Sequence, residues 1–133
     1  MKEIRLHETK TIEKKVTENM LANRVGSGGV SVYATPMMIA LMEECASSLL
    51  ASFLEEGETS VGIRMDATHD AATPLSMNVK ATAEIIKAEG KKVTFQITAM
   101  DEIDTIGTAK HERFIVNKER FEQKAMRKQS CAK

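Results

Sequence analysis

The longest apolar stretch of the chain has a helical pattern. It runs from Pro36 to about Glu55, and apolar residues occupy most of the circumference of the helix that it predicts. Thr35 followed by Pro36 is typical of a helix start, because threonine can cap a helix and proline fits its first position. Gly57 fits a helix stop. We therefore expect one long helix that is buried on most sides.

After residue 59 the apolar positions recur at every second residue. The alternation covers residues 59–66, 77–85, 93–99 and 106–116, and a weaker β pattern at residues 10–16 precedes the helix. Period-two alternation is typical of antiparallel strands with one packed face and one solvated face. The pattern predicts an α+β fold, in which a curved antiparallel sheet wraps a long central helix.

A sheet of this kind leaves an edge, and edges are usually covered by pairing. A two-fold dimer that joins two sheets would cover the edge and create a cleft between the subunits. We therefore expect a homodimer, or a tetramer built from two such dimers. The 133 residues fit one domain spanning residues 1–133, with residues 1–8 and 122–133 expected to be frayed.

Composition excludes several classes of partner. The 19 basic and 19 acidic residues balance, whereas binding to nucleic acid needs a basic excess or a basic stripe. We expect no membrane partner, because no stretch is long and apolar enough to span a bilayer and the first residues lack the apolar run of a signal peptide. Cys45 and Cys131 lack metal-type spacing, so we expect no metal site and two free thiols in a cytoplasmic protein.

Two adjacent carboxylates stand in the apolar helix. On an α-helix the side chains of Glu43 and Glu44 point about 100° apart. Either both reach water along an open side of the helix, or one faces a cleft. Desolvation in a cleft would raise the pKa of that carboxylate toward a value useful for a base or a nucleophile. The pattern alone decides neither between the two residues nor between the two interpretations.

Other positions could carry chemistry, and each has a structural alternative. His69 ends a predicted strand, where it could exchange a proton near pH 7 or simply be solvated. Thr35 could have a purely structural role as the helix cap. Alternatively, the start of the helix could in addition stabilise an oxyanion. Gly62 could let a ligand approach the backbone or could mark a bulge. His111, with Arg113 nearby in the last strand, could be structural, catalytic or part of a dimer cleft.

Several short motifs occur together along the chain. They cover residues 25–32, 34–38 and 40–44 around the helix start, residues 61–62 and 68–74, and residues 110–113 in the last strand. In this combination the chain resembles the fluoroacetyl-CoA thioesterase family of hot-dog proteins. The resemblance implies a hot-dog fold and hydrolysis of a small acyl-CoA thioester at a dimer cleft. It implies no cofactor, since CoA enters only as part of the substrate.

The same resemblance implies a catalytic trio of Thr35, Glu43 and His69, and thus selects Glu43 over Glu44. In the mechanism that we expect, Glu43 attacks the thioester carbonyl or activates water, and His69 carries the proton. Two alternatives stay open. One is a non-catalytic hot-dog module that binds acyl-CoA or lipid. The other is a dehydratase, which uses a different placement of histidine and carboxylate.

The resemblance also implies two substrate-binding residues and one difference from the family. Gly62 is expected to approach the thioester, and Arg113 is expected to lie near the pocket. The fluoroacetyl-CoA enzyme carries phenylalanines in the loop before the helix, which form a lid over the acyl group, whereas this chain has serine and glycines at residues 27–29. We therefore expect a more open pocket and an acyl group that differs from fluoroacetyl or is larger.

Overall fold

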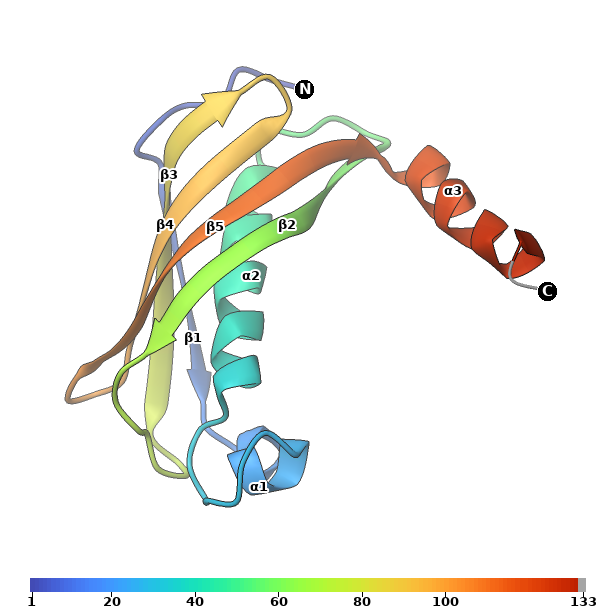
Figure 1. Ribbon diagram of the computed structural model, residues 1–133. Helices are drawn as coiled ribbons and strands as arrows, with labels where there is room; N and C mark the ends of the chain where they lie inside the picture. The colour runs from blue at the N-terminus through green and yellow to red at the C-terminus, as the bar shows by residue number, and fades with distance from the viewer. Residues whose placement is uncertain (132–133) are drawn as a thin grey trace.

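A curved antiparallel sheet with a long helix in its concavity forms the body of the protein, seen in a computed structural model that describes residues 1–131 (Figure 1). This is the arrangement that the alternating and helical patterns predict. The five strands lie in the order β1-β3-β4-β5-β2, so β1 and β2 are the edges. The elements are β1 (Thr9–Lys15), the 3-10 turn η1 (Glu18–Met20), α1 (Ala22–Val25), α2 (Thr35–Ala51), β2 (Glu58–His69), β3 (Asn78–Glu89), β4 (Lys92–Met100), β5 (Thr105–Asn117) and α3 (Lys118–Cys131).

The hydrophobic core lies between α2 and the concave face of the sheet. Gly107 of β5 allows a close approach, because a Cβ atom there would overlap the carbonyl oxygen of Thr68 and lie 2.8 Å from Sδ of Met38. Burying these apolar side chains is the main stabilising contribution to the fold. Fully buried members of this core include Met42, Cys45 and Leu50 of α2 and Ile85, Phe95, Ile97 and Ile106 of the sheet.

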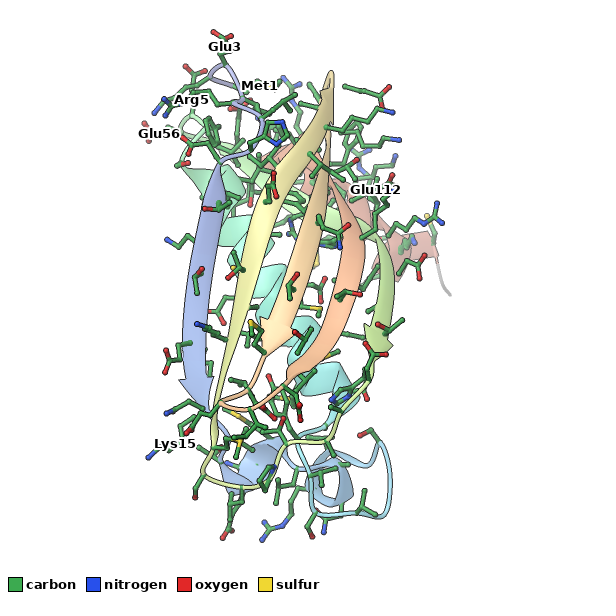
Figure 2. All side chains as sticks on the ribbon, turned by 90° about the vertical axis from the view of Figure 1, so that its left-hand side faces the viewer. Met1, Glu3, Arg5, Lys15, Glu56 and Glu112 are labelled. Atoms are coloured by element: carbon green, nitrogen blue, oxygen red, sulfur yellow. The ribbon has the colours of Figure 1, made fainter. Side chains whose placement is uncertain are left out.

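The helix α2 is buried on most sides, as its pattern predicts, but one side of it is open. Pro36, Ala40 and Glu44 are exposed and recur every four residues, so they form one stripe along the helix. The strands wrap around the opposite side, and Figure 2 looks onto the outer face of the sheet with α2 behind it. One side of α2 is therefore open in the single chain.

The helix also ends earlier than the pattern predicts, at Ala51 rather than near residue 55. The next residue, Ser52, donates its hydroxyl to the carbonyl oxygen of Leu49 at 2.8 Å and also donates its backbone N–H to that oxygen. These bonds satisfy a carbonyl of the last turn without a further helical residue. Gly57, with φ of 87°, lies in the following turn and does not end the helix.

Edge strand β2 carries an irregularity at its middle. The register with β5 shifts between Gly62 and Arg64, which leaves Ile63 outside the pairing. Ile63 is 52% exposed, although the alternating pattern assigns it to the packed face. A β-bulge bends a strand and changes the direction of its side chains. The shift therefore affects the orientation of the backbone at Gly62.

The two chain ends differ from the frayed ends that we expect. Lys2 donates its N–H to the carbonyl oxygen of Phe53 at 2.8 Å, and the terminal ammonium contacts Glu58 at 3.1 Å. Residues 122–131 belong to α3, which begins at Lys118, projects away from the sheet and has no buried side chain (Figure 1). Residues 132 and 133, also expected to be frayed, lie outside the described residues. No helix within residues 1–131 is long and apolar enough to cross a membrane.

Candidate functional site

The first residue of α2 and the last residue of β2 are hydrogen-bonded. Thr35 Oγ1 lies 2.7 Å from Nδ1 of His69. The cap that the sequence predicts for Thr35 is wrong, because Ala34 occupies the N-cap position and no side chain caps the helix. The Thr35 hydroxyl is therefore free to orient the imidazole ring.

The second ring nitrogen of His69 lacks a partner within the described part of the chain. Its Nε2 atom is buried and has no hydrogen-bond partner among residues 1–131. Desolvation by burial lowers the pKa of His69, against the opposing effects of the Asp70 carboxylate and a backbone hydrogen bond of Ala71. The ring is thus neutral near pH 7 and keeps one nitrogen for a proton transfer.

A cavity of about 290 Å³ adjoins the Thr35–His69 pair. One wall is formed by the loop before α2 and the other by the segment after β2, so the glycine-rich loop does border the site. A larger hollow of about 780 Å³ lies beside α3, but its lining includes none of the residues expected in the site. Besides the pair itself, the smaller cavity is lined by Ser27, Gly28, Val30, Val32, Ala71 and Ala72, among others.

The structure separates the roles of the two adjacent carboxylates. Glu44 is exposed, and its Oε1 atom lies 3.4 Å from Nζ of Lys14 on β1. Glu43 is half-buried and faces the opposite edge, where its Oε2 atom would lie 3.0 Å from a Cβ atom placed on Gly62 of β2. Glu43 is thus the carboxylate that faces inward, whereas Glu44 faces solvent.

Side chains fill the space above Gly62. A Cβ atom there would meet Glu43 Oε2 at 3.0 Å, His111 Cε1 at 3.1 Å and Arg113 Nη1 at 3.4 Å. The contacts with Glu43 and His111 are tighter than ordinary van der Waals contacts, so a side chain at residue 62 would press on both groups. The sequence predicts that a ligand approaches the backbone of Gly62 closely. In the single chain, these three side chains occupy that position instead.

Arg113 is held by the opposite strand. It is 7% exposed, donates from Nε to the hydroxyl of Ser60 at 2.8 Å and donates from Nη2 to the carbonyl oxygen of Ser60 at 3.0 Å. Desolvation lowers the pKa of Arg113, and the nearby Glu43 carboxylate opposes that effect. Arg113 therefore remains a buried cation beside a carboxylate.

His111 is part of this cluster, but the sequence assigns it no definite role. It is 1% exposed, and its Nε2 atom lies 3.1 Å from Nη1 of Arg113. The signal in the sequence is its alternation with Ala109 and Arg113, which places all three on the inner face of β5. The alternation predicts the face of the strand on which His111 lies, but it does not predict the hydrogen bond with Arg113.

The expected site residues thus form two groups in one protomer. Thr35 and His69 lie at the start of α2, whereas Glu43 lies with Gly62 and Arg113. Eight residues separate Thr35 from Glu43, which corresponds to a rise of about 12 Å along an α-helix. Among the described residues of one protomer, no hydrogen bond or ion pair joins Glu43 to His69, and Glu43 is not among the residues that line the cavity beside His69. No group of three or more His, Cys, Asp or Glu side chains in residues 1–131 is arranged to hold a metal ion.

Comparison with known proteins gives consistent matches. Residues 16–119 match the family described as fluoroacetyl-CoA-specific thioesterase (FlK). The fluoroacetyl-CoA thioesterase of Streptantibioticus cattleyicolor is 39% identical over 97 residues, which cover 73% of this chain and 70% of that protein. A solved structure of FlK has a TM-score of 0.90 at 32% identity, covering 95% of this chain and 98% of that one. A thioesterase superfamily member from Thermus thermophilus has a TM-score of 0.90 at 31% identity, covering 100% of both chains.

The comparisons confirm the family and the fold that the sequence motifs imply. The match covers most of the chain, including both groups of site residues. The helix inside a curved antiparallel sheet is the architecture that the solved thioesterase structures share with this chain. The chain belongs to the fluoroacetyl-CoA-specific thioesterase family of hot-dog thioester hydrolases.

Proposed function

We propose that this protein hydrolyses a small acyl-CoA thioester in a cleft between two protomers, with Thr35, Glu43 and His69 as catalytic residues. The observation that carries the proposal is the buried Nε2 atom of His69, which has no partner among the described residues while Thr35 holds the other ring nitrogen. A buried nitrogen without a partner is costly unless a ligand or water supplies one. The adjoining cavity has room for such a ligand.

The start of α2 supplies a means to polarise the thioester carbonyl. Pro36 has no N–H, and the N–H groups of Met37 and Met38 both donate to the carbonyl oxygen of Ala34. The N–H of Thr35 is the first-turn donor for which the described residues supply no acceptor. A helix N-terminus also carries a partial positive charge. Both features would stabilise the oxyanion that forms when the carbonyl is attacked.

Glu43 supplies the carboxylate for the attack. It either adds directly to the carbonyl carbon, or removes a proton from a water molecule that adds there. Collapse of the tetrahedral intermediate breaks the C–S bond. In the water route, neutral His69 receives through Glu43 the proton that the water loses and passes it to the departing CoA thiolate; in the direct route, that proton comes from the water that cleaves the next intermediate. Direct attack would leave an anhydride that water then cleaves. Either route yields a free carboxylic acid and CoA, and a thioester is activated enough to need no cofactor.

A second protomer would bring the two groups of residues together. Edge strand β2 leaves its outer backbone groups free to pair, and the exposed Ile63 lies on this edge. If two β2 strands paired antiparallel about a two-fold axis near residues 65 and 66, the Gly62 region of one protomer would face the His69 end of the other. Glu43 of one protomer would thus serve the Thr35–His69 pair of its partner. Further pairing of such dimers would give a tetramer.

The loop before α2 bears on the choice of acyl group. Ser27 and Gly28 line the cavity beside His69, and no aromatic side chain stands in residues 26–29. We propose an acyl group that differs from fluoroacetyl or is larger. We also place the protein in the cytoplasm, since Cys45 and Cys131 are free thiols, as is usual in a reducing compartment.

The reaction is tested by measuring release of free CoA from a panel of acyl-CoA substrates. Glu43→Gln and His69→Ala should each lower kcat/KM by on the order of 100-fold or more. Glu44→Gln is the matched control, because Glu44 is exposed and pairs with Lys14 on the far side of the helix. Wild-type rates in both catalytic variants would contradict the assignment. Tight binding of acyl-CoA without release across the panel would instead favour a binding module.

The composite site is tested by mixing inactive variants. If one site uses Glu43 of one protomer and His69 of the other, equal mixing and reassembly of Glu43→Gln and His69→Ala chains regenerates intact sites in half of the dimers. Activity should then return to about one quarter of the wild-type value. If both residues act within one protomer, no mixture regains activity, and the two-protomer site is wrong.

A further inference from the structure

His111 makes two side-chain hydrogen bonds that together define its protonation. Its Nδ1 atom lies 2.7 Å from the carbonyl oxygen of Arg64, and its Nε2 atom lies 3.1 Å from Nη1 of Arg113. A carbonyl oxygen only accepts and a guanidinium only donates. Nδ1 must therefore carry the proton, and Nε2 must accept from Arg113. Both bonds form only when His111 is neutral.

The accepted bond completes the fixation of Arg113. Ser60 holds the Nε and Nη2 side of the guanidinium, and His111 holds Nη1. A guanidinium has five N–H bonds, so three are used and one remains on each terminal nitrogen. Nη1 lies 3.4 Å from the Cβ position of Gly62, and Glu43 Oε2 lies 3.0 Å from the same point. Nη1 and the Glu43 carboxylate thus flank the same point, and the carboxylate acts on Arg113 through its charge, without an ion pair between them among the described residues.

We propose that His111 is a positioning residue, which in its neutral form with the proton on Nδ1 holds the Arg113 guanidinium beside Glu43. This inference rests on the proposed function, in which Glu43 acts on the thioester, and on the expectation from the family resemblance that Arg113 is a substrate-binding residue near the pocket. His111 itself touches no substrate. It acts by fixing the plane of the Arg113 guanidinium. The unused N–H groups are then already oriented when the substrate binds, and the Arg113 side chain does not have to change its rotamer.

The surroundings of His111 keep it neutral. Arg113 and Glu112 come from β5, Glu43 comes from α2, and β2 contributes the Arg64 carbonyl. Desolvation lowers the pKa of His111 below its usual value. The Arg113 charge lowers it further, against the opposing effects of the Arg64 carbonyl and the two carboxylates. A protonated ring would turn an N–H toward the guanidinium and break the bond that holds it.

A purely structural role offers a clear alternative. Arg64 lies at the bulge of β2, and the Nδ1 proton of His111 could serve only to satisfy its carbonyl group. Two substitutions separate these roles. Asparagine places an amide N–H near the position of Nδ1 but does not reach Arg113, whereas glutamine places an amide oxygen near the position of Nε2. His111→Asn thus keeps the bulge contact, and His111→Gln keeps the acceptor for Arg113.

The two roles predict opposite rankings. If His111 positions Arg113, His111→Asn should lower kcat/KM on the order of 100-fold, and His111→Gln should recover much of that loss. If His111 only supports the bulge, the asparagine variant should be the more active of the two, which would overturn the proposal. Thermal unfolding of both variants is measured in parallel, so that a variant that fails to fold is recognised.

A spectroscopic measurement keeps the test independent of turnover. In protein with 15N-labelled histidine, the ring shifts of His111 at pH 7 should show the neutral tautomer with the proton on Nδ1, and the ring should become protonated only at a lower pH than a solvated histidine. Arg113→Lys should change the Nε2 shift, because it replaces the donor. A proton on Nε2, or an Nε2 shift indifferent to Arg113→Lys, contradicts the inference. If the wild type releases no CoA from any acyl-CoA, the proposed function is wrong. The NMR measurement then still tests whether neutral His111 accepts a hydrogen bond from Arg113.

Discussion

Thr35 and His69 are 34 residues apart in the sequence, yet Thr35 Oγ1 and His69 Nδ1 are 2.7 Å apart in the structure. The contact joins the start of the central helix to the end of an edge strand. It gives the histidine a fixed orientation, while the other ring nitrogen stays buried and without a partner in the described chain. A histidine held in this way resembles a proton carrier more than a solvated loop residue.

Removing the Thr35 hydroxyl should reduce activity through the orientation of His69. We expect Thr35→Ala to lower kcat/KM by roughly 10- to 100-fold, because the imidazole loses the bond that fixes it. Thr35→Ser keeps the hydroxyl and should retain most of the activity. Steady-state kinetics of both variants check this expectation. Equal losses in both would show that the methyl group of Thr35, rather than its hydroxyl, matters.

The charge of Asp70 should set the acid limb of the pH profile. Burial lowers the pKa of His69, and the Asp70 carboxylate opposes that effect. Asp70→Asn removes the opposing charge, so the pKa of His69 falls further and the ring stays neutral to a lower pH. The fall of kcat/KM with decreasing pH should therefore shift to lower pH. A profile that is unchanged or moves to higher pH would show that another group controls the limb.

Adding one methyl group at Gly62 should disturb the cluster around Glu43. The new Cβ atom would press on the Glu43 carboxylate at 3.0 Å and on the His111 ring at 3.1 Å. We expect Gly62→Ala to lower kcat/KM at least about tenfold. Gly29→Ala is the control, since a Cβ atom there meets nothing within 4 Å. Retained activity in Gly62→Ala would mean that the three neighbouring groups adjust without effect on the reaction.

An aromatic side chain at Gly28 should narrow the acyl preference. Gly28 lines the cavity beside His69, and a Cβ atom there makes only an ordinary contact of 3.7 Å with Ala22. Gly28→Phe should therefore reduce the rate with longer acyl groups more than the rate with acetyl-CoA. Gly29→Phe adds the same bulk to the same loop at a residue outside that lining. A parallel loss for all acyl lengths would argue against a role of this loop in selection.

The loop after β4 should contribute to stability in a pH-dependent way. Burial alone would raise the pKa of Asp101, but hydrogen bonds from the backbone of Asp104 and Ile103 and from the Thr73 hydroxyl lower it below its usual value. The contribution of a carboxylate with a lowered pKa is present above its unfolded-state pKa of about 3.9 and is lost as the pH falls through the folded-state pKa.

The substitution Asp101→Asn should accordingly cost about 1–3 kcal/mol of unfolding free energy at pH 7, because the amide cannot replace the charged acceptor. Urea unfolding of both proteins at pH 7 and near pH 3 measures the difference. It should shrink at the lower pH, because the carboxyl of the unfolded wild type is then largely protonated and the charged acceptor contributes less to stability. A difference that is the same at both pH values would show that charge is not its source.

Much of the architecture is predictable because each pattern has a local cause. The alternation of residues 77–85 and 93–99 predicts β3 and β4, whose inner residues are buried against α2. The boundaries are less predictable. Ser52 ends α2 through a bond to Leu49, and nothing in the hydrophobic pattern marks that position. Likewise, the exposure of Ile63 follows from a register shift between strands that are about 50 residues apart.

The sequence by itself determined the helix, the strands and the family, because side-chain periodicity and short motifs are local properties of the chain. It also located Thr35, Glu43 and His69 as candidates. Only the tertiary structure decided that Thr35 bonds His69 instead of capping the helix. It also decided that Glu43 turns inward while Glu44 pairs with Lys14. The reason is that these contacts depend on how distant segments approach one another, which no local pattern records.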